Sequence, residues 1–178
     1  MNEKRTFAGH LAAMFTIFVW GTTFVSTKIL LQSFEPVEIL FLRFLLGFFA
    51  LALARPVFLK TKGFEEERFF LAAGLCGVTL YFLLENIALT FTLASNVGVI
   101  LSTAPFFTAL ASYFFLKGER PGKRFFLGFL IAMAGIVLIG FNGSFVLKIN
   151  PAGDLLSVLA ALVWAFYSVL TRKIGQFG

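Results

Sequence analysis

Charged side chains are scarce in this sequence: Asp, Glu, Lys and Arg make up 13% of its 178 residues, about half the share found in an ordinary soluble domain. It holds one cysteine, Cys76, and one histidine, His10, so neither a disulfide framework nor a Cys/His metal site can be built from it. We therefore expect no metal and no cofactor. Hydrophobic residues make up 59% of the chain, and its mean hydropathy is +0.92, which predicts that lipid surrounds most of it.

The apolar residues are gathered in runs that match the thickness of a bilayer. A helix needs about 20 mainly apolar residues to span the hydrocarbon core, and short polar or Gly/Pro-containing breaks separate six such runs. The pattern predicts an all-α membrane protein, a multi-span helix bundle. The expected spans are 11–31, 37–54, 69–91, 94–116, 125–141 and 153–171. The last two are short, and we expect them to extend into their flanks.

The Lys and Arg residues predict the direction of these spans. Cytoplasmic loops carry the excess of basic residues. With a cytoplasmic N-terminus, only Lys28 and Lys148 fall on the far side and Arg43 falls within a span. We therefore expect a cytoplasmic N-terminus in the cell membrane. Because apolar runs separate the basic residues, they form no single basic face, so we expect the lipid bilayer, and no nucleic acid, as a partner.

The end of the chain repeats its beginning. Residues 8–28 align with 152–172 at an offset of 144, with seven of the 21 positions identical, among them an Ala-Gly entry and a central tryptophan. The second copy lies five spans after the first, and five is odd, so the two helices must cross the membrane in opposite directions. The sequence predicts a first five-helix repeat at 1–151, followed at 152–178 by the first helix of an inverted second repeat.

Two full repeats of this period would need roughly 290 residues and ten helices. We therefore expect the sequence to be the N-terminal portion of a longer protein, which the missing C-terminal half or a second copy would complete. Inverted repeats of this kind build a site near the bilayer midplane and expose it to each side in turn.

Five segments carry a resemblance to a known family. They are 'VWGTTF' (19–24), 'PVEILFLRF' (36–44), 'LENIALTFTLASNVGVILSTAPFFTAL' (84–110), 'KGERPGKR' (117–124) and 'GFLIAMAGIVLIG' (128–140). In order and spacing the chain resembles the EamA type of the drug/metabolite transporter superfamily. The resemblance implies a small-molecule transporter, usually an exporter, made of two inverted five-helix repeats. Its substrates would be metabolites or drugs.

Two ionisable residues lie well inside the expected spans. Arg43 and Glu85 are each seven residues from the same end of neighbouring antiparallel helices, so both lie about 10 Å deep. An unpaired charge at depth costs about 2.5–3.5 kcal/mol or more, so we expect an ion pair between them. Such a pair can pin the two helices together, or it can contact substrate or gate its path. Alternatively, the Arg43 side chain can extend outward to the membrane surface.

Aromatic and polar residues at mid-span are further candidates for the substrate path. The repeat predicts that Trp20 and Trp164 face each other across a central cavity, although ordinary packing explains them as well. Pro105 lacks a backbone N–H and should bend the fourth span beside a pocket. Polar side chains of the first and fourth spans can line the path, although we favour hydrogen bonds between helices for most of them. The polar candidates are Thr23, Asn96 and Ser102.

Small residues in the fifth span, Gly128, Ala132 and Gly135, have a spacing that suits close contact with another helix. An enzyme would need a nucleophile with a base, paired carboxylates or metal ligands within the spans, and one Glu opposite one Arg is too little. Two alternatives to a transporter remain: a non-transporting membrane scaffold, and a half-transporter that needs a second chain.

Overall fold

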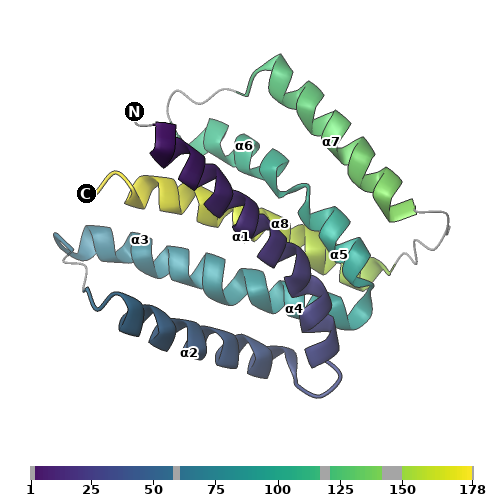
Figure 1. Cartoon of the computed structure of the whole chain (residues 1–178), viewed down its shortest axis with the longest axis horizontal. Helices are drawn as coiled ribbons and strands as arrows, with labels where there is room; N and C mark the ends of the chain where they lie inside the picture. The colour runs from purple at the N-terminus through teal and green to yellow at the C-terminus, as the bar shows by residue number, and fades with distance from the viewer. Residues whose placement is uncertain (1–2, 58–60, 117–120, 142–149, 178) are drawn as a thin grey trace.

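The structure is a computed structural model that describes residues 3–57, 61–116, 121–141 and 150–177. Helices make up most of this part of the chain, and the described residues contain no strand (Figure 1). The all-α, multi-span fold class predicted from the sequence is confirmed.

The helices follow the expected spans closely. The first two spans are α1 (Glu3–Leu30) and α2 (Pro36–Ala54). The third is one long helix made of α3 (Phe64–Gly74), the π-helical turn η1 (Leu75–Leu80) and α4 (Tyr81–Phe91), and the fourth is broken into α5 (Ala94–Leu101) and α6 (Ala104–Phe115). The last two are α7 (Lys123–Phe141) and α8 (Pro151–Ile174), each longer than the apolar run that predicted it.

Within the described ranges, five helices are long and apolar enough to cross a membrane. They are Thr6–Leu30, Pro36–Ala54, Phe64–Phe91, Ala94–Phe115 and Pro151–Ile174. The fifth expected span, 125–141, is helical as α7 but is not among these five.

Local sequence signals explain where several helices begin. At α2, Pro36 takes the first turn, and the Glu35 backbone N–H donates to the Glu38 carboxylate at 2.9 Å, which is half of a capping box. At α8, the side chain of Asn150 accepts a hydrogen bond from the Gly153 N–H at 3.2 Å. Each contact supplies a partner for a backbone group that a helix terminus leaves free.

The fourth span breaks where Pro105 predicts a bend. α5 ends at Leu101, and α6 restarts at Ala104 with Pro105 in its first turn. Proline cannot donate an N–H to the turn before it. The hydroxyls of Ser102 and Thr103 donate to the carbonyls of Gly98 and Ile100 at 2.7 Å and 2.6 Å. The predicted bend is therefore present as a full interruption of the helix.

The buried core of the bundle is built around α8. This helix lies among α3, α4, α5 and α6 (Figure 1), and it contributes small side chains to a buried apolar cluster. The cluster consists of Ala88, Leu89, Val97, Leu101, Ala104, Ala160 and Ala161. Two glycines let helices approach α8 closely. A Cβ on Gly77 of η1 would overlap the Tyr167 ring, and one on Gly153 would lie 2.9 Å from the Thr92 side chain.

By contrast, α1 and α7 are peripheral. Every side chain of α1 from Thr6 to Thr22 is exposed. On α7, a Cβ added to Gly128 or Gly135 would meet no atom within 4 Å, so the prediction that this small-residue stripe makes close helix contact is wrong for the described chain. Instead, α7 packs through aromatic rings, with Phe129 stacked on Phe106 of α6 at 5.4 Å, because large side chains hold the two backbones apart.

Candidate functional site

Arg43 of α2 makes its hydrogen bond to α1. Its guanidinium donates to Oγ1 of Thr27 at 2.6 Å, and Thr27 is fully buried. Arg43 also lies over the Phe82 ring, 5.3 Å from its centroid. The expected ion pair with Glu85 is therefore wrong as a direct contact, because a hydroxyl and an aromatic face already hold the guanidinium.

Glu85 of α4 is nevertheless close enough to Arg43 to be attracted by its charge. The side chain is 2% exposed and lies near Tyr81, one turn earlier on the same helix. Its Oε1 atom has no hydrogen-bond partner among the described residues. A buried carboxylate oxygen without a donor is costly, so this atom can still accept a bond from a proton, an ion or a substrate.

The two tryptophans meet, as the repeat predicts. The rings of Trp20 on α1 and Trp164 on α8 lie edge to face, with centroids 5.8 Å apart. Trp164 also contacts Tyr81 at 4.7 Å and Tyr167 at 5.1 Å. Tyr81 lies one turn before Glu85 on α4, so a line of rings leads from the contact between the two repeated helices toward the buried carboxylate.

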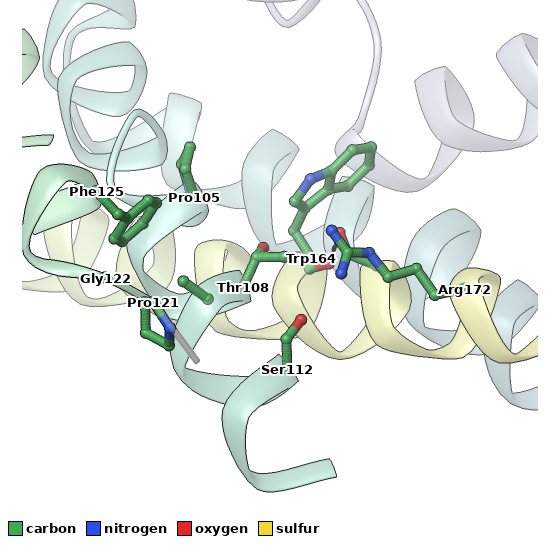
Figure 2. A pocket seen from close by; sticks show the side chains of 10 residues that line it. Pro105, Thr108, Ser112, Pro121, Gly122, Phe125, Trp164 and Arg172 are labelled. Atoms are coloured by element: carbon green, nitrogen blue, oxygen red, sulfur yellow. Dashed lines mark hydrogen bonds between the residues drawn. The ribbon is translucent and has the colours of Figure 1, made fainter. Parts of the chain in front are cut away.

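A cavity of about 750 Å³ opens beside Trp164, between α6, the start of α7 and the second half of α8 (Figure 2). Pro105 lies in its wall, so the predicted kink does face a pocket. The lining residues are Pro105, Thr108, Ala109, Ser112, Pro121, Gly122, Phe125, Trp164, Ser168 and Arg172. Of the path candidates named from the sequence, this lining holds Trp164 and Pro105.

The polar candidates lie elsewhere, and most bond within their own helix. Thr23 donates to the Trp20 carbonyl at 2.7 Å, and Ser102 donates to the Gly98 carbonyl at 2.7 Å. The interpretation that such groups bridge helices is wrong for these two, since a backbone carbonyl one turn earlier is nearer than any neighbouring helix. Asn96 does link two elements, because it bonds Oγ1 of Thr92 just after α4 at 3.1 Å.

Three polar residues that tie the helices together were missed as site residues. The Lys28 ammonium donates to the carbonyls of Leu89 and, at 2.9 Å, Thr92. The Asn86 side chain, fully buried, donates to the Pro36 carbonyl at 3.0 Å, and that of Asn150 donates to the Phe91 carbonyl at 2.9 Å. These bonds join α1, α2 and α8 to the end of α4. The sequence repeat, which aligns residue 28 with residue 172 and so places a basic residue at the same position in both copies, is the only sequence signal for the role of Lys28.

Comparison with known proteins gives a consistent result. The profile of the EamA-like transporter family matches residues 7–141. An "Uncharacterized transporter" of Archaeoglobus fulgidus is 32% identical over 98% of this chain and 59% of its own length. The transporter YdfC of Bacillus subtilis is 28% identical over 99% of this chain and 58% of its own.

The inner membrane transporter YedA of Escherichia coli K12 is 30% identical over 91% of the chain and 53% of its own length. The chain thus spans little more than half the length of these curated relatives. No solved structure matches it.

Proposed function

Because the chain belongs to the EamA-like transporter family and is a multi-pass membrane protein, we propose that the protein transports small metabolites or drugs across the cytoplasmic membrane. The family points to transport and to no enzymatic reaction. We propose further that the protein is an exporter with a cytoplasmic N-terminus, and that it works by alternating access between inverted repeats.

The observation that carries this proposal is the meeting of the two repeated helices beside a cavity. α8 runs in the opposite direction to α1 (Figure 1), and their aligned tryptophans touch at 5.8 Å. Trp164 forms part of the cavity wall. A cavity at the axis that relates two inverted repeats is where secondary transporters bind their substrates.

The two repeated helices, α1 and α8, differ in how much of their surface is buried, and this difference supports a second repeat. On α8 the positions Gly153, Ser157 and Ala165 are buried against α4 and its neighbours. On α1 the aligned Gly9 and Gly21 are exposed, with nothing within 4 Å of an added Cβ. We propose that residues 1–151 form one repeat, that 152–178 begin another, and that helices of that other repeat pack on α1 as α3 to α6 pack on α8.

Flux measurements test the proposal. The complete product of the gene that encodes this chain is reconstituted in proteoliposomes, and the flux of a panel of labelled metabolites and cationic drugs is compared with that of empty liposomes. Expression in cells should lower the internal level of a transported compound. If no compound crosses faster than in empty liposomes, the proposal of a transporter is wrong and a scaffold role replaces it. If a transported compound accumulates inside the cells, the protein is an importer and the proposed direction is wrong.

The polar cluster has its own test in the same assay. We propose that Glu85 and Arg43 gate the path or contact substrate, so Glu85→Gln and Arg43→Gln should lower flux while the protein stays folded. The double variant Arg43→Glu/Glu85→Arg would restore flux if only their mutual attraction matters. Unchanged flux in Glu85→Gln removes Glu85 from the functional residues.

A further inference from the structure

Two neighbouring residues inside the third span lack a hydrogen-bond partner. Oε1 of Glu85 and Oδ1 of Asn86 are buried and accept from no donor among the described residues. The two residues are 2% and 0% exposed. The hydrocarbon core of a membrane holds no water that could supply the missing donors, and the carboxylate oxygen is the costlier of the two because it carries charge. Glu85 therefore needs a partner that the described side chains do not provide.

The cations that α1 and α2 present to this part of α4 are held by other groups. The Arg43 guanidinium donates to Oγ1 of Thr27 and lies over the Phe82 ring, and no ion pair joins it to Glu85 within the described ranges. The Lys28 ammonium donates to two backbone carbonyls at the end of α4. Positive charge is thus close enough to attract the Glu85 carboxylate, but it does not neutralise this carboxylate by contact.

The other surroundings of Glu85 hold few groups that can titrate. Tyr81, one turn earlier on α4, is a phenol, and η1 holds only the thiol of Cys76. The helix α5 contains no ionisable residue, and Tyr167 of α8 lies against Gly77 of η1. The remaining charged residues of α2 and α8 lie in the end turns of these helices and are Glu38, Asp154, Arg172 and Lys173. No second carboxyl on the described helices packed against α4 therefore lies at this depth.

The burial of Oε1 limits the size of its missing partner. The atom exposes almost no surface, so a helix that packs on the outside of this bundle cannot bring it a donor. In this arrangement of the helices neither a substrate nor a hydrated ion has room beside it. A proton needs no room, and it removes the charge that makes the burial of a carboxylate costly.

We propose that Glu85 binds a proton in this arrangement of the helices, and that this proton controls the gate. Oε1 takes the proton from water when α1 or α2 separates briefly from α4, and it returns the proton to water when the carboxyl ionises. The charged carboxylate then attracts the Arg43 guanidinium away from Thr27, so α2 exchanges a bond with α1 for one with α4. The inference rests on the proposed gating role of Glu85 and Arg43, and it names the ion that operates the gate.

Infrared spectroscopy tests the proposal without any transported compound. The complete product of the gene is placed in nanodiscs, and spectra are compared between H₂O and D₂O at neutral pH and then during titration to alkaline pH. A protonated carboxyl has a C=O band that a carboxylate lacks, and this band shifts in D₂O. Labelling of the glutamates with ¹³C assigns the band to glutamate in the unaltered protein, so this part of the test does not require a variant to fold.

We expect a band of protonated glutamate at neutral pH, its replacement by carboxylate bands at alkaline pH, and its loss in Glu85→Gln. The matched control is Glu67→Gln, which removes an exposed carboxylate in the first turn of α3 and should leave the band unchanged. Thr27→Val frees Arg43 to approach Glu85 and should weaken the band at neutral pH at least about twofold. Arg43→Gln removes the cation and should leave the band at full strength.

Several results would overturn the proposal. These are the absence of a protonated-glutamate band in the unaltered protein at neutral pH, and a band that persists in Glu85→Gln. A band that is lost when Na⁺ is added at constant pH would show that the site belongs to a metal cation instead of a proton. An unchanged band in Thr27→Val would show that Arg43 does not exchange between the two partners, so the proton would not control the gate.

The proton site and the transport function can fail separately. A Glu85 band in a protein that carries no compound into proteoliposomes would support the proton site and refute transport. Flux without a Glu85 band would support transport and refute the proton site. If the band is present but flux in Glu85→Gln depends on pH as in the unaltered protein, the proton does not operate the gate and the proposal is wrong.

Discussion

The ammonium of Lys28 fastens α1 to the end of α4, and replacing it offers a direct test of how this bundle is held together. In Lys28→Met the apolar stem remains and the donor is lost. Two backbone carbonyls, those of Leu89 and Thr92, then lose the partner that they have in the native protein. Both lie in the last turn or the cap of α4, where carbonyls lack partners within the helix.

The expected loss follows from the kind of bond. A hydrogen bond from a charged group contributes about 1.5–3 kcal/mol, so two would give about 3 kcal/mol at the low end. Lys28 is only half-buried, and water can partly replace it, which reduces the expected loss by about half. We expect Lys28→Met to lower the free energy of unfolding by about 1.5 kcal/mol, close to a tenfold change in the unfolding equilibrium constant.

Unfolding of the purified protein, followed by far-ultraviolet circular dichroism during titration with a denaturing detergent, measures this loss. Lys28→Arg should retain most of the stability. The control is Lys123→Met, which removes an exposed lysine at the start of α7 and should change the free energy by less than about 0.5 kcal/mol. If Lys28→Met is as stable as Lys123→Met, the bonds to the α4 carbonyls contribute nothing and the reasoning fails.

Two further variants and one double-mutant cycle test other contacts by the same titration. Gly153→Val should cost about 1–3 kcal/mol, because its Cβ would lie 2.9 Å from a side chain at the end of α4. Thr27→Val should cost about 1–3 kcal/mol, since it removes the hydroxyl that accepts from Arg43. A double-mutant cycle with Trp20→Leu and Trp164→Leu should show a coupling of about 0.5–1.5 kcal/mol from their edge-to-face contact; additive effects would mean that the rings do not meet.

Two of these variants have matched controls in the chain. Gly47→Ala adds a methyl group where nothing lies within 4 Å, so it should not destabilise the protein as Gly153→Val does. Thr16→Val removes an exposed hydroxyl that bonds only its own helix, at the Ala12 carbonyl. If Thr16→Val lowers the free energy of unfolding as much as Thr27→Val does, the hydrogen bond from Arg43 to Thr27 does not contribute to stability.

Much of the fold could be predicted because hydropathy encodes depth. Apolar runs gave most helix ends to within about three residues, although α1 begins at Glu3 and α3 at Phe64, eight and five residues before the expected spans. The charges at the ends of the runs gave the expected direction. The repeat added one contact between distant segments, that of Trp20 with Trp164. Pro105 marked a break because its missing N–H has the same consequence in any helix.

Rotation about each helix axis could not be predicted in the same way. In a soluble helix the apolar stripe shows which face is inward, but a helix in lipid is apolar all round, so nothing in the runs says which way Arg43 points. The sequence placed Arg43 and Glu85 at one depth and could not show that Thr27 would take the guanidinium. For the same reason, the sequence could not show that the Lys28 ammonium points toward the carbonyls at the end of α4.

The π-helical turn η1 has a consequence for how this segment should be aligned with others. A π turn holds one residue more than an α turn, so the helical wheel of α4 is offset from that of α3 by one position, about 100°. A sequence with one residue fewer within 75–80, and a plain α-helix there, would keep the faces of both α3 and α4. A one-residue gap at this place is therefore structurally neutral, whereas the same gap within 82–84 would rotate Glu85 by about 100° relative to α3 and turn it away from Arg43.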